Sequence, residues 1–148
     1  MTKKKLYDIC VQIVQDKIAI AKQGMEEAQA SANNETKSSA GDKYETGRAM
    51  SQRERDLHAR QLAELINMKK TFSTIDPKKR CAKVELGAYV ETATAKFFVS
   101  ASLGAVKVGK ETIMAISAIS PIAQAMLGKQ AGDTFIWMKK ETEILSIG

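Results

Sequence analysis

Apolar and small residues recur at every third or fourth position through the first part of the chain. The resulting stripe consists of Cys10, Val14, Ile18, Ala21, Met25, Ala28 and Ala32. Four larger apolar residues widen it near its start: Leu6, Ile9, Ile13 and Ile20. This spacing places the stripe on one face of an α-helix, so it predicts an amphipathic helix over residues 5–32.

A second helical pattern covers residues 42–72. Its apolar positions are Met50, Leu57, Leu62, Leu65, Ile66 and Phe72. Charged residues fill its middle, and we expect His58 to lie exposed among them. The connection at residues 31–39 is rich in serine, asparagine and threonine, which favour turns over helix interiors. A short connection makes the two helices antiparallel, so the sequence predicts a helical hairpin.

The periodicity changes after Asp76-Pro77, because proline disfavours a helix at the residue before it. Short β-prone segments follow, at residues 84–92, 95–100, 113–116, 134–138 and 142–147. Turns are expected at Gly132-Asp133 and Lys139-Lys140. Ser120 is expected to cap a brief helix at residues 122–127, with Pro121 at its first position and Gly128 at its end. The sequence therefore predicts an α+β protein, with a hairpin (1–76), a basic linker (77–83) and a small antiparallel sheet domain (84–148).

Composition narrows the possible functions. The chain has 148 residues and a formal net charge of +6, which permits contact with nucleic acid or an acidic protein surface without identifying either. It contains no run of 18 apolar residues and no signal-peptide pattern, so we expect a cytoplasmic protein with no membrane contact. With Cys10, Cys81 and His58 as its only thiols and imidazole, the chain lacks the parts for most nucleophilic and zinc chemistries. We expect Cys10 to lie on the seam of the coiled coil, Cys81 to lie in the linker or at the start of a strand, and Trp137 to pack in the core.

The segment Gly41-Asp42-Lys43-Tyr44-Glu45 lies where the hairpin turns. Asp42 and Glu45 are three positions apart, so on a helix they occupy the same side. One interpretation is a capping box, in which Asp42 is the N-cap and Glu45 closes the box. The other is a pair of carboxylates that holds a cation. These residues alone leave both interpretations open.

Residues 116–133 resemble the C-terminal signature of the Gre family of bacterial transcript cleavage and elongation factors. That signature is a strand, Ser-Pro, a short helix rich in alanine and leucine, Gly-Lys, Gly-Asp and two final strands. Its dipeptides occur here in order as Ser120-Pro121, Gly128-Lys129 and Gly132-Asp133. The resemblance covers about residues 84–147 and implies an FKBP-like domain preceded by an antiparallel coiled coil. The family's Gly-Asp-x-x-Glu pattern at the hairpin tip is matched by residues 41–45.

The resemblance implies a factor that binds RNA polymerase and inserts its hairpin tip into the polymerase's secondary channel. Asp42 and Glu45 would then hold Mg²⁺ shared with the polymerase and stimulate cleavage of backtracked transcripts. The protein would need no cofactor of its own and would not be an enzyme by itself. Expected contacts of the tip, with the polymerase and indirectly with nascent RNA, are Lys37, Lys43, Tyr44 and Arg48. Expected polymerase-docking residues are Ile119, Ser120 and Pro121.

The chain departs from the family pattern at two places. Cleavage factors usually continue after the tip with an Asn-Ala-Glu-Tyr-like run, whereas this chain has Thr46-Gly47-Arg48-Ala49. Ile119 stands before Ser120, where the family often has an acidic residue. Two alternatives therefore stay open. One is a non-catalytic channel occupant that inhibits the polymerase or competes with cleavage factors, and the other is a helical-hairpin scaffold. Prolyl isomerase activity is disfavoured because no aromatic-lined pocket is evident. We expect a monomer on the polymerase and leave a dimer in solution open.

Overall fold

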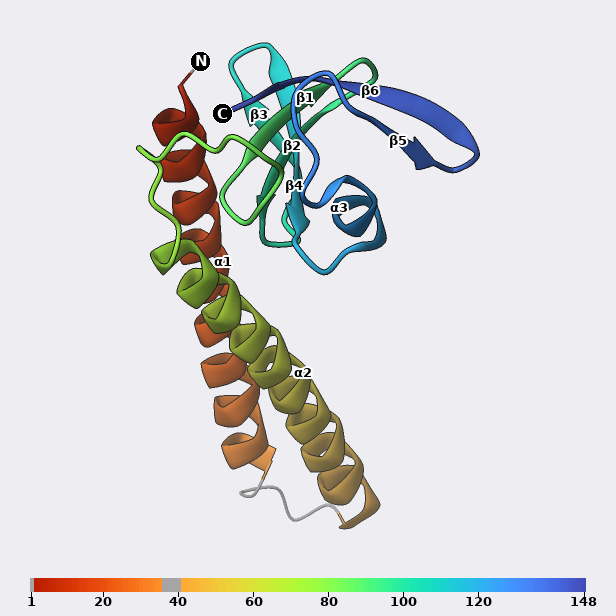
Figure 1. Ribbon diagram of the computed structural model, residues 1–148. Coiled ribbons are helices and arrows are strands. Elements are labelled where there is room, and N and C mark those ends of the chain that lie inside the picture. Colours follow the sequence, from red (N-terminus) through yellow and green to blue (C-terminus); the bar gives the residue numbers. More distant parts are fainter. Residues whose placement is uncertain (1, 36–40) are drawn as a thin grey trace. The chain divides into compact units, whose positions relative to one another are not determined.

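The computed structural model describes residues 2–35 and 41–148, with the backbone alone for residues 34, 35 and 41–45. It contains two long helices, α1 (Lys3–Glu35) and α2 (Gly41–Ser73), each of 33 residues (Figure 1). The other elements are β1 (Tyr89–Thr92), β2 (Lys96–Ser100), β3 (Gly104–Val108), β4 (Glu111–Ser117), α3 (Pro121–Met126), β5 (Thr134–Trp137) and β6 (Lys140–Ile147). The predicted α+β class, a helical hairpin followed by a small sheet domain with one short helix, is confirmed.

The chain divides into two compact units. One comprises Met1–Gln12 and Lys70–Gly148 and contains the sheet. The other comprises Ile13–Lys69 and contains most of both helices. The base of the hairpin therefore belongs to the same unit as the sheet.

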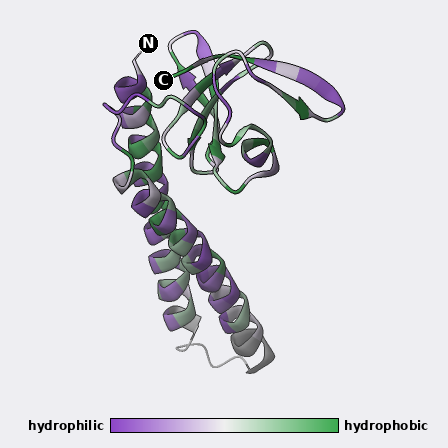
Figure 2. Cartoon of the chain, in the orientation of Figure 1, coloured by the Kyte–Doolittle hydropathy of each residue, from purple (hydrophilic) through white to green (hydrophobic). Residues whose placement is uncertain are grey.

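The apolar stripe of α1 forms the buried face of that helix. Val14, Ala21, Ala28 and Ala32 are at most 4% exposed. Ile20 is an exception to the predicted widening of the stripe, because it lies off the buried face and is 68% exposed. Figure 2 shows the hydrophilic faces that both helices carry as well. No helix in the described part of the chain has an apolar stretch that could cross a membrane.

The helix α1 continues beyond the predicted start of the connection. Residues 31–35 are helical, so the expectation of a turn there is wrong. The Gln29 side-chain amide donates a hydrogen bond to Asn33 Oδ1 at 3.1 Å, which supports the last turns of the helix. The rest of the predicted connection, residues 36–39, lies outside the described residues.

The buried face of α2 is rotated from the predicted one. Phe72 is buried, but Met50, Leu57 and Ile66 are 63%, 47% and 39% exposed. The partly buried positions include His58, Leu62, Leu65 and Met68. The expectation that His58 is exposed is therefore wrong. Steps of seven from Phe72 back through Leu65 to His58 keep these three residues on one face.

The six strands form one sheet in the order β3-β4-β2-β1-β6-β5. All neighbours are antiparallel except β2 and β4, which are parallel, so the prediction of a wholly antiparallel sheet is wrong. The cause is β3, which the sequence pattern did not predict. It lies on the outer side of β4 and turns into it at Gly109 (φ +63°), and this arrangement gives β4 the same direction as β2.

Two strand boundaries also differ from the prediction. Residues 84–88 form bends and turns, because Gly87 adopts φ +91° and ends the extended conformation before β1. The β5–β6 turn lies at Met138 and Lys139, one residue earlier than predicted, and both have positive φ (50° and 66°). Positive φ at both central residues is the geometry that matches the twist of a two-residue hairpin.

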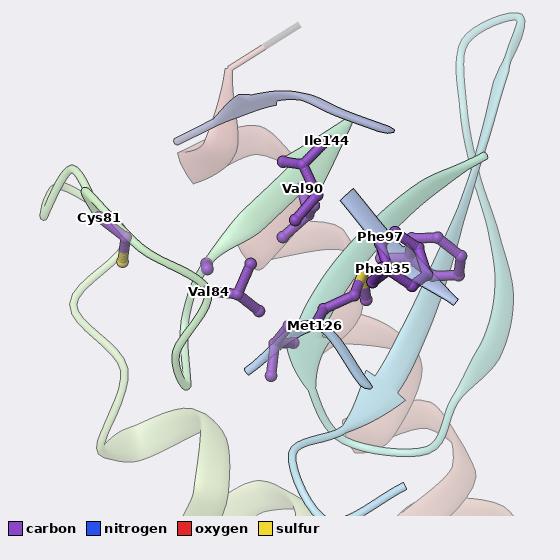
Figure 3. Packing of buried hydrophobic residues seen from close by; sticks show 9 residues of the cluster. Cys81, Val84, Val90, Phe97, Met126, Phe135 and Ile144 are labelled. Carbon is purple, nitrogen blue, oxygen red and sulfur yellow. The ribbon is translucent and has the colours of Figure 1, made fainter. Parts of the chain in front are cut away.

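The sheet is packed on both sides within its unit. One core cluster consists of Cys81, Val84, Ala88, Val90, Phe97, Val99, Met126, Phe135 and Ile144, and Figure 3 shows Phe97, Phe135 and Met126 gathered in it. Trp137 is partly buried against this cluster, as expected for core packing. Phe98, next to Phe97, points to the opposite face, where its ring lies 6.3 Å from the ring of Phe72 in α2.

Candidate functional site

The acid pair lies at the first turn of α2. This helix begins at Gly41, after α1 has ended at Glu35, so positions 42 and 45 both have helical backbone immediately after the hairpin turn. Asp42 therefore lies inside the helix and not at the flanking N-cap position. Acidic residues in a first turn are favoured by the helix dipole, so a structural role for the pair remains open.

The expected tip contacts are only partly covered by the structure. The side chains of Asp42, Lys43, Tyr44 and Glu45 lie outside the described residues, and so does the whole of Lys37. The structure therefore leaves their contacts as predictions. Beyond them, Arg48 is exposed and Gly47 is half-buried.

The predicted docking residues lie together on the loop that enters α3. Ser120 is the N-cap (φ −65°, ψ 151°), and its Oγ accepts a hydrogen bond from the Ala123 N–H at 3.4 Å and donates one to the Ser117 carbonyl at 2.6 Å. Pro121 occupies the first position of the helix, so the predicted cap is confirmed. Ile119 is 85% exposed. The loop thus holds an apolar side chain outward on a backbone fixed by the cap.

A close helix contact in the hairpin was not predicted. A Cβ atom at Gly24 of α1 would lie 2.6 Å from His58 Cε1 of α2, so only glycine lets the imidazole lie against this backbone. His58 Nδ1 is buried and has no hydrogen-bond partner among the described residues. The signal in the sequence was the position of His58 two heptads before Phe72, on the seam of the hairpin.

Two grooves in the hairpin share Ile20 and His58. The first, of about 380 Å³, is lined by Lys17, Ile20, Ala21, His58, Gln61, Glu64, Leu65 and Met68. The second, of about 410 Å³, is lined by Ile20, Gln23, Gly24, Glu27, Ala28, Ser31, Glu54 and His58. The first groove carries one cation and one carboxylate, Lys17 and Glu64, whereas the charged residues of the second, Glu27 and Glu54, are both acidic.

The thiols are poorly suited to nucleophilic chemistry. Burial raises the pKa of the Cys10 thiol to about 11, so this thiol is protonated at neutral pH. Burial is also the main cause of the raised pKa of Cys81, and the nearby Lys3 ammonium opposes it. Both cysteines are buried. Among the described residues, no group of three or more His, Cys, Asp or Glu side chains could hold a metal ion, and the side chains of Asp42 and Glu45 fall outside that set.

No protein-family model and no curated protein matches the chain. Among solved structures, the chain is similar to one described as "Structure of the transcription factor Gfh1", at 19% sequence identity. The alignment covers 93% of this chain and 92% of that chain, with a TM-score of 0.38.

Proposed function

We propose that the protein is a Gre-type transcription elongation factor that binds RNA polymerase and stimulates cleavage of backtracked transcripts. The observation that supports this is the position of the Gly41-Asp42-x-x-Glu45 pattern, in the first turn of α2 directly after the hairpin turn. The Ser120-Pro121 cap, which belongs to the C-terminal resemblance, lies in the same chain.

The proposal requires the acid pair to reach a catalytic centre buried in another molecule. An α-helix rises 1.5 Å per residue, so a 33-residue helix is about 50 Å long. Residues in the first turn of α2 can therefore be presented far from the residues at its other end. This is the geometry that entry into a narrow channel demands.

The donor set fits a magnesium ion. Mg²⁺ prefers hard oxygen ligands in octahedral geometry and commonly binds proteins through one or two carboxylates, which is what Asp42 and Glu45 provide. Hydrolysis of a phosphodiester by two metal ions needs ligands for both ions, and the polymerase would supply the others. The chain's own residues would thus position the ion, while the reaction would belong to the polymerase. Lys43, Tyr44 and Arg48 are near the acid pair in the sequence and would therefore contact the channel or the nascent RNA.

A second candidate is a non-catalytic occupant of the same channel. The run Thr46-Gly47-Arg48-Ala49 favours it, because this run lacks the acidic and aromatic residues that follow the tip in cleavage factors. An occupant of this kind would slow nucleotide addition without shortening the transcript.

The test is a purified, backtracked polymerase complex with labelled RNA. Wild-type protein is expected to shorten the transcript. Asp42→Asn and Glu45→Gln are expected to reduce the cleavage rate by at least about tenfold, because losing even an outer-shell partner of a metal ligand costs about 10–100-fold in metal affinity or activity. Glu26→Gln, an exposed acid on α1, removes the same charge elsewhere and should leave the rate unchanged. Intact transcripts with slowed elongation would support the second candidate, and no binding to polymerase would reject both.

A further inference from the structure

A basic patch lies where the start of α1 meets the segment after α2. Residues 2–8 and 76–85 carry seven cations, Lys3, Lys4, Lys5, Lys78, Lys79, Arg80 and Lys83, against three carboxylates, Asp8, Asp76 and Glu85. Figure 2 shows hydrophilic stretches in both segments. Both belong to the unit that contains the sheet.

Lys3 joins the two segments. Its Nζ donates hydrogen bonds to the Lys79 carbonyl at 2.7 Å and to the Gly148 carbonyl at 3.3 Å, and it lies 3.7 Å from Cys81 Sγ. Lys3 is therefore occupied in fixing the arrangement, whereas the other six cations are exposed. This hydrogen bond ties the start of α1 to the segment after α2.

Part of the patch's charge has no ion-pair partner among the described residues. In the part of the chain that the structure describes, Lys4 and Lys79 of this patch make ion pairs, with Asp8 and Glu85, each at 3.3 Å. Within the described residues, Lys5, Lys78 and Arg80 make none. Such a grouping of exposed, unneutralised cations attracts a polyanion.

The position of the lysines at the start of α1 strengthens this conclusion. The first turn of α1 contains no acidic residue and begins with Lys3, Lys4 and Lys5. A helix N-terminus carries partial positive charge, so three lysines there are unfavourable for the helix itself. An external anion would relieve this repulsion.

The residues around the patch favour a phosphate backbone over an acidic protein surface as its ligand. Protein interfaces have an apolar or aromatic centre, but no large apolar side chain is exposed within residues 2–8 or 76–85. Binding of single strands depends on aromatic rings on which bases stack, and the one ring in these segments, Tyr7, is half-buried with its hydroxyl bonded to the Phe72 carbonyl. A phosphate backbone that needs only cations fits this surface best.

We propose that this patch binds the phosphate backbone of duplex nucleic acid without regard to sequence. The contact is separate from the acid pair at the hairpin turn and does not depend on the function proposed above. It would give the protein an anchor on duplex nucleic acid at the base of the hairpin.

The test measures binding of the full chain to a fluorescent 30-base-pair DNA duplex by anisotropy as a function of salt. The variant Lys78→Gln/Arg80→Gln/Lys83→Gln is expected to bind more weakly, and the slope of log K against log salt should fall by about one for each cation removed. Lys107→Gln/Lys110→Gln/Lys140→Gln removes the same charge from exposed positions on the sheet and should bind like wild type. Circular dichroism checks that both variants are folded.

Four outcomes would overturn the proposal. The first is the absence of wild-type binding to the duplex at 50 mM salt, and the second is an equal loss of affinity in the two triple variants. The third is stronger binding to poly-glutamate than to the duplex, which would identify an acidic protein surface as the partner. Tighter binding to single strands than to the duplex would likewise reject the choice of a duplex.

Discussion

The imidazole of His58 lies against the backbone of Gly24, with three ring atoms 2.6–2.9 Å from where a Cβ at Gly24 would stand. The two residues are on opposite helices of the hairpin, and both groove linings include His58. Glycine inside a helix is unfavourable by about 1 kcal/mol relative to alanine. Its presence in the middle of α1 is therefore explained by the imidazole that occupies the space of the missing methyl group.

This contact predicts that the effect of one substitution depends on the other residue. Gly24→Ala alone should lower the melting temperature of the helical signal, because overpacking costs about 1–3 kcal/mol and exceeds the gain in helix propensity. In a His58→Ala background, the same change should raise the melting temperature, because only the propensity gain of about 1 kcal/mol remains. Thermal unfolding followed by circular dichroism of the four proteins measures this reversal. Additive effects in the double variant would show that the ring simply moves away.

The hydroxyl of Tyr7 predicts a second effect on stability. It donates a hydrogen bond of 2.8 Å to the Phe72 carbonyl, in a part-buried site where the two rings pack edge to face with centroids 5.9 Å apart. Tyr7→Phe keeps the ring and should reduce the free energy of unfolding by about 0.5–1.5 kcal/mol.

Tyr89→Phe is the matched control for this change, because the structure records no hydrogen bond from the Tyr89 hydroxyl to another described residue. It should change the free energy of unfolding by less than about 0.5 kcal/mol. Urea unfolding of both variants makes the comparison. Equal losses would indicate that the Tyr7 hydrogen bond does not stabilise the base of the hairpin.

Cys10 predicts a loss of stability at alkaline pH. Its folded-state pKa is raised by burial from 9.0 to about 11. Because the unfolded chain releases this proton first, the thiol's contribution to stability is complete below pH 9 and is lost as the pH rises toward 11. The loss should be on the order of 2 kcal/mol.

Urea unfolding of wild type and Cys10→Ala between pH 8 and pH 11 measures this effect. The alanine variant is less stable at pH 8, since it leaves a cavity. The difference between the two proteins should narrow as the pH rises. A difference in unfolding free energy that stays constant across the range would mean that the thiol has the same pKa in the folded and the unfolded protein.

The sequence by itself determined the elements whose signals are local. The three- and four-residue spacing from Cys10 to Ala32 identified the buried face of α1, because that face depends only on helical periodicity. The cap of α3 followed from Ser120-Pro121, since an N-cap hydrogen bond joins residues only three positions apart. The acid spacing at Asp42 and Glu45 is likewise a property of the chain alone.

Contacts between distant residues were decided only by the tertiary structure. The direction of β4 beside β2 depends on how β3 is added to the sheet, and no local pattern in the segment from Gly104 to Val108 marked it as an edge strand. The place of His58 on the hairpin seam depends on the rotation of α2 against α1, which Gly24 permits from the opposite helix. The basic patch forms because Lys3 reaches the Lys79 carbonyl across 76 positions of sequence. Each of these is a packing of separate segments, and its energy arises only when the whole chain has folded.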